Sequence, residues 1–523
     1  MKQFFYFIIC AFFLVFWSSC REDFNFSPST GNLEFSKDTI YLDTVFTNIG
    51  SSTYNLKVYN RSNKDIVIPV IQLAQGENSF YRMNVDGSTG NEGTLQGKRF
   101  EDVELLAKDS MFIFIETTIN IETLSASDTQ FLYTDAILFD GGTNQQRVEL
   151  VTLVKDAVFI YPQRFEDGFI ETLTFDADGD GTPDETNLQG RFLNDDELTF
   201  TNEKPYVIYG YAAVGDGKIL VMQPGTRVHF HADSGLLITN GGSLQINGAL
   251  SANQTLMEGE VILEGDRLEP LFSDIPGQWG TIWLFNDSNN NSINHATIKN
   301  ATVAILCDGN QDDSNKLNIS NTQIYNSSNF GILGRATSVN GTNVVINNSG
   351  QSSFAGTFGG RYNFTHSTLV NYWNTSFRQF PSVLINNFLI DEDNNAITNN
   401  LEEANFNNCI IDGNSNVEFL LEDLNGSSFN YKFNNCLLRF NNNNLSGTGN
   451  YNLSEINYYE NNVFNSNPNF KLPFENQLII GNNSAAINIG NTTFANNVPN
   501  DILGVSRTAS PDAGAYQHIT FDD

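Results

Sequence analysis

The chain has 523 residues, more than a single hydrophobic core usually organises, so two or three domains are expected. Its 27 basic and 60 acidic side chains give a formal net charge of −33, which repels nucleic acid and anionic lipid and attracts divalent cations or basic partners. The charge therefore argues against a nucleic-acid partner, although it has a simpler interpretation as the solubility of an exposed protein. A hydrophobic fraction of 40%, with 42 Phe and 18 Tyr, favours folded β structure.

Residues 1–19 have the pattern of a leader peptide. One positive charge precedes an almost unbroken apolar run from Phe4 to Trp17, and Ser18-Ser19-Cys20 follows. The run is too short to span a bilayer, and small residues precede the cysteine. This resembles a bacterial lipoprotein signal peptide, in which cleavage leaves Cys20 to carry the lipid, although Trp17 replaces the usual leucine. A plain secretory peptide or an uncleaved anchor is the alternative.

The resemblance implies a protein held to the outer membrane by a lipid on Cys20, with residues 20–32 as a tether. Arg21-Glu22-Asp23 resembles the short charged export signal of surface lipoproteins in the Bacteroidota. We therefore expect the chain to be exposed on the cell surface, and a periplasm-facing orientation is the alternative.

Residues 33–162 alternate apolar and polar side chains in short runs separated by turn signals. A period of two places alternate side chains on opposite faces of a sheet, so residues 39–46 and 54–60 are expected to be strands. Several short strands without a helical stretch predict a β-sandwich. Their order resembles the immunoglobulin-like modules of bacterial surface proteins, which implies a spacer that lifts the next domain off the membrane.

Residues 163–203 are polar and acidic and are expected to form a linker. This linker contains a short loop of alternating carboxylates with glycines in the turn, a spacing that places oxygens around a hard cation such as Ca²⁺. The predicted ligand positions are Asp176, Asp178, Asp180, Thr182 (through its carbonyl) and Asp184. The loop resembles the calcium loops of thrombospondin type 3 and dockerin repeats. Because Asn187 replaces the usual bidentate Glu, that ligand is expected from Asp195 or Asp196. Bound calcium would stiffen the junction between domains, and a solvated acidic turn is the alternative.

The stretch from residue 295 to residue 441 repeats a short pattern: an Asn or His, two residues, an aliphatic side chain, and another Asn. A period of about twenty β-prone residues is typical of a solenoid, whose coils must stack to bury their apolar faces. The aliphatic anchors are Ile298, Ile324, Ile346, Leu369, Ile411 and Leu438. The longer gap before Ile411 predicts one more coil there, with Leu389 as its anchor. Cys409 and Cys436 occupy equivalent places in two coils, where they either fill the core as thiols or form a disulfide.

Residues 204–519 as a whole resemble a right-handed parallel β-helix. Gln223-Pro224-Gly225 joins two apolar strands as in an opening coil, and residues 484–516 resemble the segment that caps the last coil of many secreted bacterial β-helix proteins. The expected fold is therefore all-β: an immunoglobulin-like β-sandwich followed by a right-handed parallel β-helix. The whole arrangement resembles lipid-anchored, pectate-lyase-like surface proteins of the Bacteroidota, including the Flavobacteria. The resemblance implies fold and location but no reaction, because this fold carries lyases, hydrolases, adhesins and stalks alike.

The sequence contains no catalytic signature that we recognise, such as a Ser/His/Asp set, a P-loop or a dinucleotide fingerprint. β-helix glycosidases use clustered carboxylates, and the acids available here are Asp308, Asp312, Asp313, Asp391, Asp393 and Asp412. Single charges at the turns between coils more often face solvent. Aromatic rings and guanidinium groups near the coil turns are the candidates for glycan contact: Tyr372, Trp373, Arg335, Arg361 and Arg378.

These patterns predict a non-catalytic binding or scaffold module on a β-helix, whose partners are glycans or outer-membrane proteins. The alternative is a polysaccharide lyase or glycoside hydrolase that acts on acidic glycans at one face of the β-helix. The two functions differ in what the β-helix surface must carry. An enzyme needs two or more facing carboxylates, or a basic residue beside an acidic cluster, in a groove.

Overall fold

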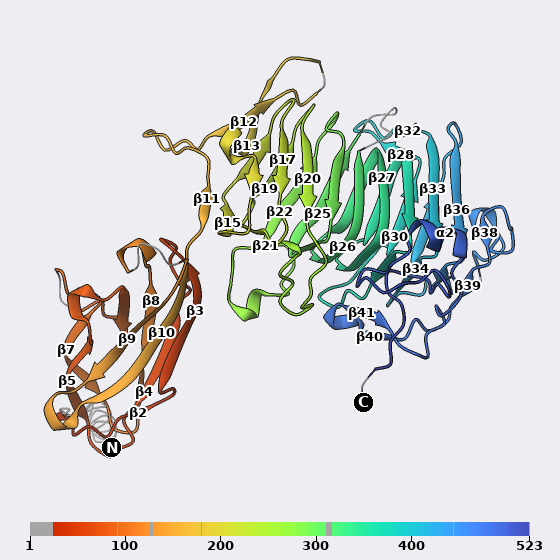
Figure 1. Cartoon of the computed structure of the whole chain (residues 1–523). Coiled ribbons are helices and arrows are strands. Elements are labelled where there is room, and N and C mark those ends of the chain that lie inside the picture. The colour runs from red at the N-terminus through yellow and green to blue at the C-terminus, as the bar shows by residue number, and fades with distance from the viewer. Residues whose placement is uncertain are drawn as a thin grey trace, which may run out of the picture. The chain divides into compact units, whose positions relative to one another are not determined.

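The computed structural model describes residues 25–521, apart from 91–92, 125–128, 179, 310–315 and 443. The leader, Cys20 and the charged tripeptide after it lie outside the described residues, so what they predict stays a prediction. The described part is almost entirely β structure and divides into two compact units, one ending at Asp156 and the other beginning at Ala157 (Figure 1). In this part of the chain no helix is long and apolar enough to cross a membrane.

The first unit is a β-sandwich of two sheets. The six-stranded sheet contains β1 (Ser27–Pro28), β3 (Thr39–Phe46), β5 (Ile66–Leu73), β7 (Arg99–Leu105), β9 (Gln130–Phe139) and β10 (Gln146–Lys155). The four-stranded sheet contains β2 (Glu34–Phe35), β4 (Tyr54–Tyr59), β6 (Tyr81–Val85) and β8 (Ser110–Thr117).

Period-two alternation builds the core of this sandwich. Along β8, Met111, Ile113 and Ile115 are buried against the other sheet, whereas Phe112 and Phe114 point to solvent. Burying one aliphatic side chain of this size contributes about 1.5–3 kcal/mol, so the alternation fixes which face of each strand points inward.

The second unit is a parallel β-helix in which each coil adds one strand to each of three sides (Figure 1). Side 1 consists of β11 (Val158–Ile160), β15 (Tyr206–Ile208), β18 (Arg227–Phe230), β21 (Val261–Gly265), β24 (Ala296–Lys299), the ends of β26 (Leu317–Ser327) and β27 (Phe330–Ser349), β29 (Thr368–Asn371), β34 (Ile410–Gly413), β37 (Leu437–Leu438) and β39 (Val463–Phe464). Side 2 consists of β13 (Asp184–Phe192), β16 (Tyr211–Val214), β19 (Gly235–Ile238), β22 (Trp279–Leu284), β25 (Ala301–Asp308), the starts of β27 and β28 (Phe354–Thr365), β30 (Val383–Asn386) and β35 (Phe419–Glu422). Side 3 consists of β14 (Thr199–Phe200), β17 (Ile219–Met222), β20 (Ser243–Asn247), β23 (Asn291–Asn294), the start of β26, the middle of β27, the end of β28, β33 (Leu401–Asn407), β36 (Phe429–Asn434) and β38 (Tyr459–Glu460).

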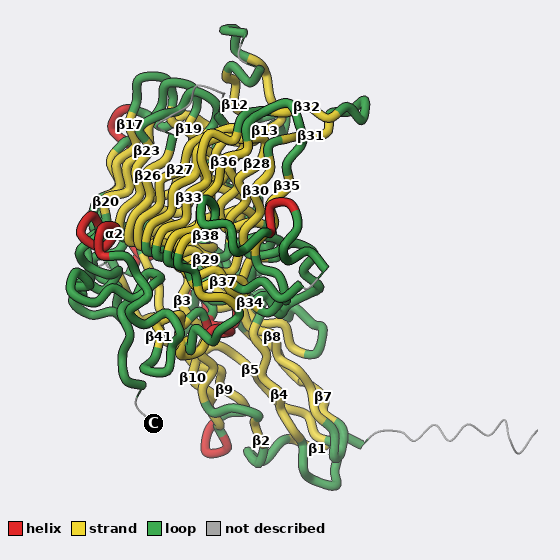
Figure 2. Tube along the Cα trace, turned by 90° about the vertical axis from the view of Figure 1, so that its right-hand side faces the viewer, coloured by secondary structure: helices red, strands yellow, loops and turns green. Residues whose placement is uncertain are grey.

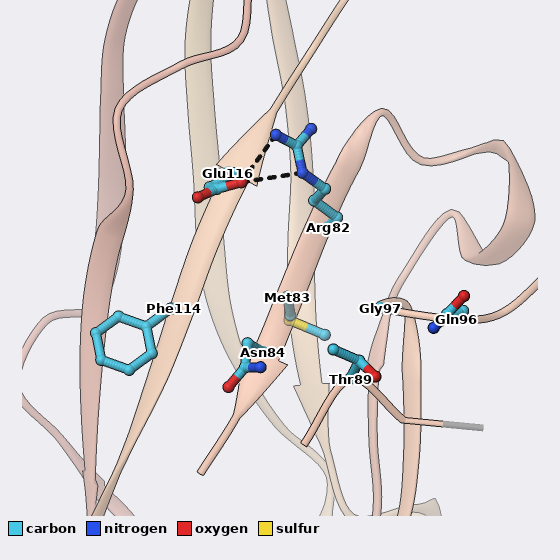
Figure 3. A pocket seen from close by; sticks show the side chains of 8 residues that line it. All are labelled: Arg82, Met83, Asn84, Thr89, Gln96, Gly97, Phe114 and Glu116. Atoms are coloured by element: carbon cyan, nitrogen blue, oxygen red, sulfur yellow. Dashed lines mark hydrogen bonds and ion pairs between the residues drawn. The ribbon is translucent and has the colours of Figure 1, made fainter. Parts of the chain in front are cut away.

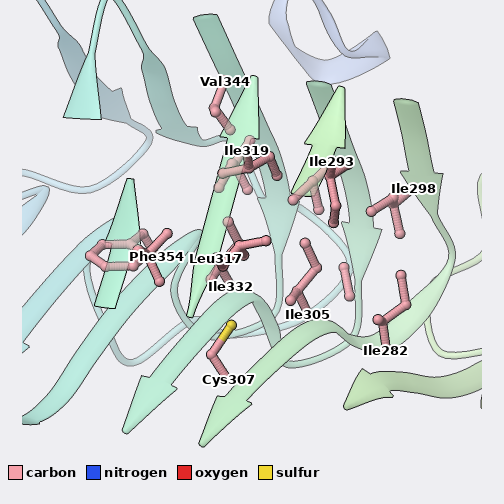
Figure 4. Close-up of a cluster of buried hydrophobic side chains, with 14 of the residues drawn as sticks. Ile282, Ile293, Ile298, Ile305, Cys307, Leu317, Ile319, Ile332, Val344 and Phe354 are labelled. Atoms are coloured by element: carbon pink, nitrogen blue, oxygen red, sulfur yellow. The ribbon is translucent and has the colours of Figure 1, made fainter. Parts of the chain in front are cut away.

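The six aliphatic anchors of the repeat stack directly on one another, as predicted. Each pairs in register with the next, from Ile298 with Ile324 through to Ile411 with Leu438, and all are fully buried. Figure 4 shows part of the core around this column: the anchor Ile298 lies near Ile293 of side 3 and Ile305 of side 2 in one buried cluster. Cys409 and Cys436 lie in the same core as free thiols, with the Cys409 N–H 3.4 Å from the Cys436 sulfur.

The first residue of each repeat makes the corner between side 3 and side 1. These residues adopt left-handed backbone angles, with φ between 47° and 54°: His295, Asn321, Asn343, His366, Asn408 and Asn435. Asn tolerates this conformation better than most residues because its short side chain can hydrogen-bond locally. The repeat in the sequence therefore corresponds to a corner of each coil and to the buried residue that follows the corner.

Two expectations about the β-helix differ from the structure. The expected linker, residues 163–203, contains strands that pair in parallel with β16 and β17, so it forms the first coil. Its composition does not reveal this, because most side chains of β13 are polar and at least partly exposed. The extra coil anchored by Leu389 does not exist: Leu369 pairs directly with Ile411. Leu389 instead lies in a hairpin of β31 (Phe388–Ile390) and β32 (Ala396–Thr398), seen at the upper right of Figure 2.

The domain boundaries at the N-terminal side differ as well. β1 lies within the expected tether, residues 20–32, and pairs with β5, so the sandwich begins before residue 33. β11 pairs with β15 of the β-helix and lies outside the sandwich that was expected to reach residue 162.

The C-terminal segment covers side 1 rather than only the end of the last coil. It contains β40 (Phe470–Leu472), β41 (Gln477–Ile480) and the helix α2 (Thr492–Asn497). Its buried Leu478, Ile480 and Ile502 belong to a cluster with the outward side chains of side 1, such as Val370 and Ile410. Side 1 is therefore closed to large ligands along its later coils.

Candidate functional site

Three carboxylates of the acidic loop converge as the sequence predicts. Oxygen atoms of Asp176, Asp178 and Asp184 all lie within 4.8 Å of one another, a separation that fits oxygens around one Ca²⁺ at about 2.3–2.6 Å from each. The loop joins β12 (Thr172–Phe175) to β13, and Leu173 and Phe175 anchor this hairpin on the outer surface of side 2.

The other predicted ligands do not join this group. Asp180 accepts a hydrogen bond from the Thr182 N–H at 2.7 Å, within its own turn, and Asp195 is paired with Lys218 at 2.7 Å. Backbone N–H groups also bond to the converging carboxylates, including Gly181 to Asp176 at 3.0 Å. Hydrogen bonds within the loop thus hold its described carboxylates. The loop belongs to the first coil of the β-helix, and the expected role of calcium at a junction between domains stays a prediction.

The five predicted glycan-contact residues do not form one site. Arg335 lies on side 2, where its guanidinium donates to Asp308 at 2.6 Å, and the indole of Trp283 donates to the same carboxylate at 2.7 Å. Arg361 lies on side 3, in register with Glu403. Two of the candidates are therefore on different sides of the β-helix, and the remaining three are covered.

Tyr372, Trp373 and Arg378 make their contacts inside one corner of the β-helix. The Tyr372 hydroxyl donates to Asp412 at 3.1 Å, and its ring packs against Phe470 and Phe474 of the C-terminal segment. Trp373 is 6% exposed, and Arg378 is 9% exposed. None of the three side chains can stack on a sugar, because the residues that follow side 1 in the chain fold back over this corner.

The acids of the enzyme alternative are also dispersed. Asp391 closes the β31–β32 hairpin turn by accepting from the Asn395 N–H at 2.7 Å. Asp412 is 2% exposed beneath Tyr372, and burial raises its pKa to about 6. Asp312 and Asp313 fall outside the described residues. Asp308, Asp391 and Asp412 therefore do not share a groove.

Side 3 carries a polar surface that the sequence motifs do not predict. Its outward side chains form two parallel ranks that run along the β-helix axis, and we call this surface the amide face. The first rank is Ser292, Asn318, Asn340, Asn363 and Asn405, and the second is Asn294, Ser320, Thr342, Thr365, Asn407 and Asn434. Figure 2 shows the strands that carry it, from β23 to β36, side by side.

Hydrogen bonds link the first rank into a ladder. Asn340 donates to Asn318 at 3.3 Å, Asn363 donates to Asn340 at 3.3 Å, and Asn405 donates to Asn363 at 2.9 Å. The residues of the two ranks are neutral and non-aromatic, but charged residues continue and flank them. Lys432 is in register with Asn405, and Glu460 is in register with Asn434. Arg361 and Glu403 are in register beside the first rank. The sequence does contain a signal for this surface: Asn residues one coil apart that alternate with the buried residues of their strands. The many Asn residues at the corners make this pattern hard to distinguish.

The buried apolar clusters of the described residues leave the amide face open. One cluster joins the C-terminal segment to side 1, and another joins the β12–β13 hairpin to side 2. Most members of both ranks are exposed or partly exposed, including Asn318, Asn340, Asn363 and Asn405.

No protein-family model and no curated protein matches the chain. Among solved structures it is similar to a family 123 glycoside hydrolase from Clostridium perfringens, at 8% identity and a TM-score of 0.16, covering 24% of this chain and 26% of that one. It is also similar to the catalytic unit of a GH87 α-1,3-glucanase from Streptomyces thermodiastaticus, at 9% identity and a TM-score of 0.15, covering 73% and 83%. A third similarity, to a GH87 α-1,3-glucanase catalytic domain in complex with tetrasaccharides, has 10% identity, a TM-score of 0.13 and coverages of 74% and 81%. TM-scores this low identify neither a fold nor an activity.

Proposed function

We propose that the chain is a lipid-anchored surface protein whose β-helix binds an extended, neutral polysaccharide along the amide face without cleaving it. The observation that carries the proposal is the ladder of in-register amides on side 3. The leader pattern supports the anchor at Cys20 and the location in the outer membrane. Replacement of Cys20 by Ser tests the anchor, since the chain should then leave the membrane fraction.

The chemistry of an amide rank suits a chain of hydroxyl groups. An amide side chain has two N–H donors and an oxygen with two lone pairs, and Asn340 uses one of each in the ladder. Its second donor and second lone pair can therefore serve a ligand. Asn363 and Asn405 also donate to Glu403, at 3.1 and 3.2 Å, so these two residues offer a ligand mainly the amide oxygen. Strands in a sheet lie about 4.8 Å apart, which is close to the rise per residue of an extended polysaccharide. One sugar residue can thus meet one coil.

The charge distribution favours a neutral ligand. A polyanion would meet the strongly negative field of the whole chain. The cations beside the ranks each have a carboxylate close by: Lys432 is paired with Glu460 at 2.7 Å, and Arg361 is in register with Glu403. Hydroxyl groups, in contrast, exchange hydrogen bonds with water for hydrogen bonds with amides at about 0.5–1.5 kcal/mol each, so affinity grows with the number of sugar residues in register.

The double variant Asn340→Ala, Asn363→Ala tests this surface. We expect it to weaken binding to an insoluble neutral polysaccharide about tenfold, because two hydrogen-bonding positions are lost. The measurement is depletion of the protein from solution by cellulose, xylan or mannan. The matched control is Asn496→Ala, which removes an exposed amide from the last turn of α2 and should bind like the parent.

Two results would contradict the proposal. Equal binding by the parent and the double variant would remove the amide face from recognition. Release of new reducing ends, or of unsaturated uronate seen in the near ultraviolet, would establish the hydrolase or lyase alternative instead.

We also propose that the acidic loop binds one Ca²⁺ through Asp176, Asp178 and Asp184. Titration calorimetry with calcium chloride should show one site with a dissociation constant of about 10⁻⁴–10⁻³ M, the range of extracellular modules. Asp176→Asn with Asp178→Asn should weaken it at least about tenfold, since affinity follows the number of charged ligands. Asp167→Asn, an exposed acid outside the loop, is the control. Unchanged binding in the double variant would assign the calcium elsewhere.

A further inference from the structure

The outer surface of the four-stranded sheet in the β-sandwich exposes a pair of aromatic rings. Phe112 and Phe114 lie two residues apart on β8 and are each 42% exposed. Their ring centroids are 6.1 Å apart, and their planes are within 17° of parallel. Exposed phenylalanine rings on a sheet surface do not gain the free energy of burial. Two such rings side by side therefore indicate a binding surface.

Amide side chains flank Phe114 on both neighbouring strands. Asn55 of β4 lies directly opposite Phe114 on one side, and Asn84 of β6 lies directly opposite it on the other. Residues directly opposite on adjacent strands have Cβ atoms about 4.5–5.5 Å apart, so the ring and the two amides share one small area.

A pocket of about 390 Å³ opens beside Phe114 (Figure 3). Its lining includes Arg82, Asn84, Thr89, Gln96, Phe114 and Glu116. The volume lies at the small end of the range for ligand pockets, about 300–1,000 Å³, which fits one or two sugar residues.

The charges in the pocket are balanced and held in place. Arg82 contacts Glu116 at 2.8 Å and donates to the Thr118 hydroxyl at 3.0 Å. Hydrogen bonds from the Thr53 hydroxyl and then from Arg82 lower the pKa of Glu116, so its carboxylate stays charged and accepts hydrogen bonds. The pair brings one positive and one negative charge, and the other polar groups are neutral.

We propose that this pocket binds a neutral glycan residue, with the apolar face of the sugar ring stacked on Phe114 and its hydroxyl groups bonded to Asn84, Gln96 and the Arg82–Glu116 pair. A sugar is the ligand that needs an aromatic face and several donors and acceptors within one small area. The balanced charge favours a ligand without a net charge. The Lys57 ammonium lies 5.1 Å from the centroid of the Phe112 ring, so the stacking surface is Phe114. The sandwich is then a binding module as well as a spacer. This site is independent of the amide face.

The test uses the full chain, titrated calorimetrically with cellohexaose, xylohexaose and mannohexaose, and with hexagalacturonate as the charged comparison. The Asn340→Ala, Asn363→Ala variant serves as the background, so that any binding measured does not depend on the amide face. We expect at least one neutral hexasaccharide to bind, and Phe114→Ala to weaken it about tenfold. Phe114→Trp should keep or improve binding.

The matched control is Tyr41→Ala, which removes a 67% exposed aromatic ring from β3 of the other sheet and should leave binding unchanged. The proposal is overturned if no neutral hexasaccharide binds, if hexagalacturonate binds better, or if Phe114→Ala binds like the parent. Vesicles of phosphatidylethanolamine and phosphatidylglycerol test the other use of exposed aromatic rings. Phe114-dependent binding to these vesicles, without hexasaccharide binding, would assign the surface to lipid.

Discussion

Replacing Arg378 with methionine is expected to lower the free energy of unfolding of the β-helix by about 3–5 kcal/mol, because it leaves a buried carboxylate without its partner. The Arg378 guanidinium lies 2.6 Å from Glu418, and the two side chains are 3% and 0% exposed. The carboxylate also accepts the N–H groups of Ser382 and Ser415 at 2.8 and 2.7 Å. These bonds do not supply the opposite charge that burial of Glu418 requires.

The measurement is the guanidinium midpoint of the β-helix unfolding transition. Lys432→Met is the matched control: it breaks a pair with Glu460 whose side chains are 35% and 39% exposed, and it should cost at most about 1 kcal/mol. Adding Glu418→Leu to Arg378→Met should recover only part of the loss. It removes the buried charge, but it leaves the N–H groups of Ser382 and Ser415 without their acceptor. A midpoint for Arg378→Met equal to that of Lys432→Met would show that water reaches the pair.

This ion pair also shows a contact that could not be predicted from the sequence. Arg378 was a candidate for glycan contact because it follows a coil anchor, and nothing near it in sequence indicates a buried partner. Its partner is 40 residues away, one coil on. The segment between β29 and β30 folds back over the coil, and only the three-dimensional path brings the two charges together.

The coil register, in contrast, was predictable because the requirement is local. A left-handed corner followed three residues later by a fully buried aliphatic recurs in six successive coils, so the pattern of Asn321 and Ile324 returns in Asn343 and Ile346. Insertions break this rule. The β31–β32 hairpin has apolar residues with strand character. Together with the segment between β29 and β30 it lengthens one coil, so Leu389 has the spacing of an anchor.

The candidate sites divide in the same way. The acidic loop is a sequence-local turn, and three of its five predicted ligands converge because neighbouring residues of one turn cannot separate far. The amide face requires the register of several coils. The sandwich pocket requires the pairing of β6 with β8 and the segment that carries Thr89 and Gln96. Phe114 and Asn84 are opposite each other only because β6 pairs with β8, and no motif in either strand predicts that pairing.

The second large effect is a pH dependence that originates at Asp412. Burial raises its pKa from the ordinary 3.8 to about 6, although the Gly413 N–H and Arg439 oppose the rise. Below about pH 3 the carboxyl is protonated in both the folded and the unfolded chain and costs nothing. Between about pH 4 and pH 6 the unfolded chain releases the proton first, so the folded state loses stability. Above about pH 6 the full cost remains, about 3 kcal/mol for a difference of this size.

Asp412→Asn is therefore expected to stabilise the β-helix by up to about 3 kcal/mol at pH 7.5 and to leave it nearly unchanged at pH 4. The amide keeps an oxygen that can accept the Tyr372 hydroxyl, which is 3.1 Å from the carboxylate in the parent. The measurement is the unfolding midpoint of both proteins from pH 4 to pH 8. Asp391→Asn is the control, because hydrogen bonds from Asn395 lower the pKa of that exposed acid, so its substitution should not become more stabilising as the pH rises. A difference between Asp412→Asn and the parent that stays constant over this range would mean that Asp412 ionises in the folded chain as readily as in the unfolded one.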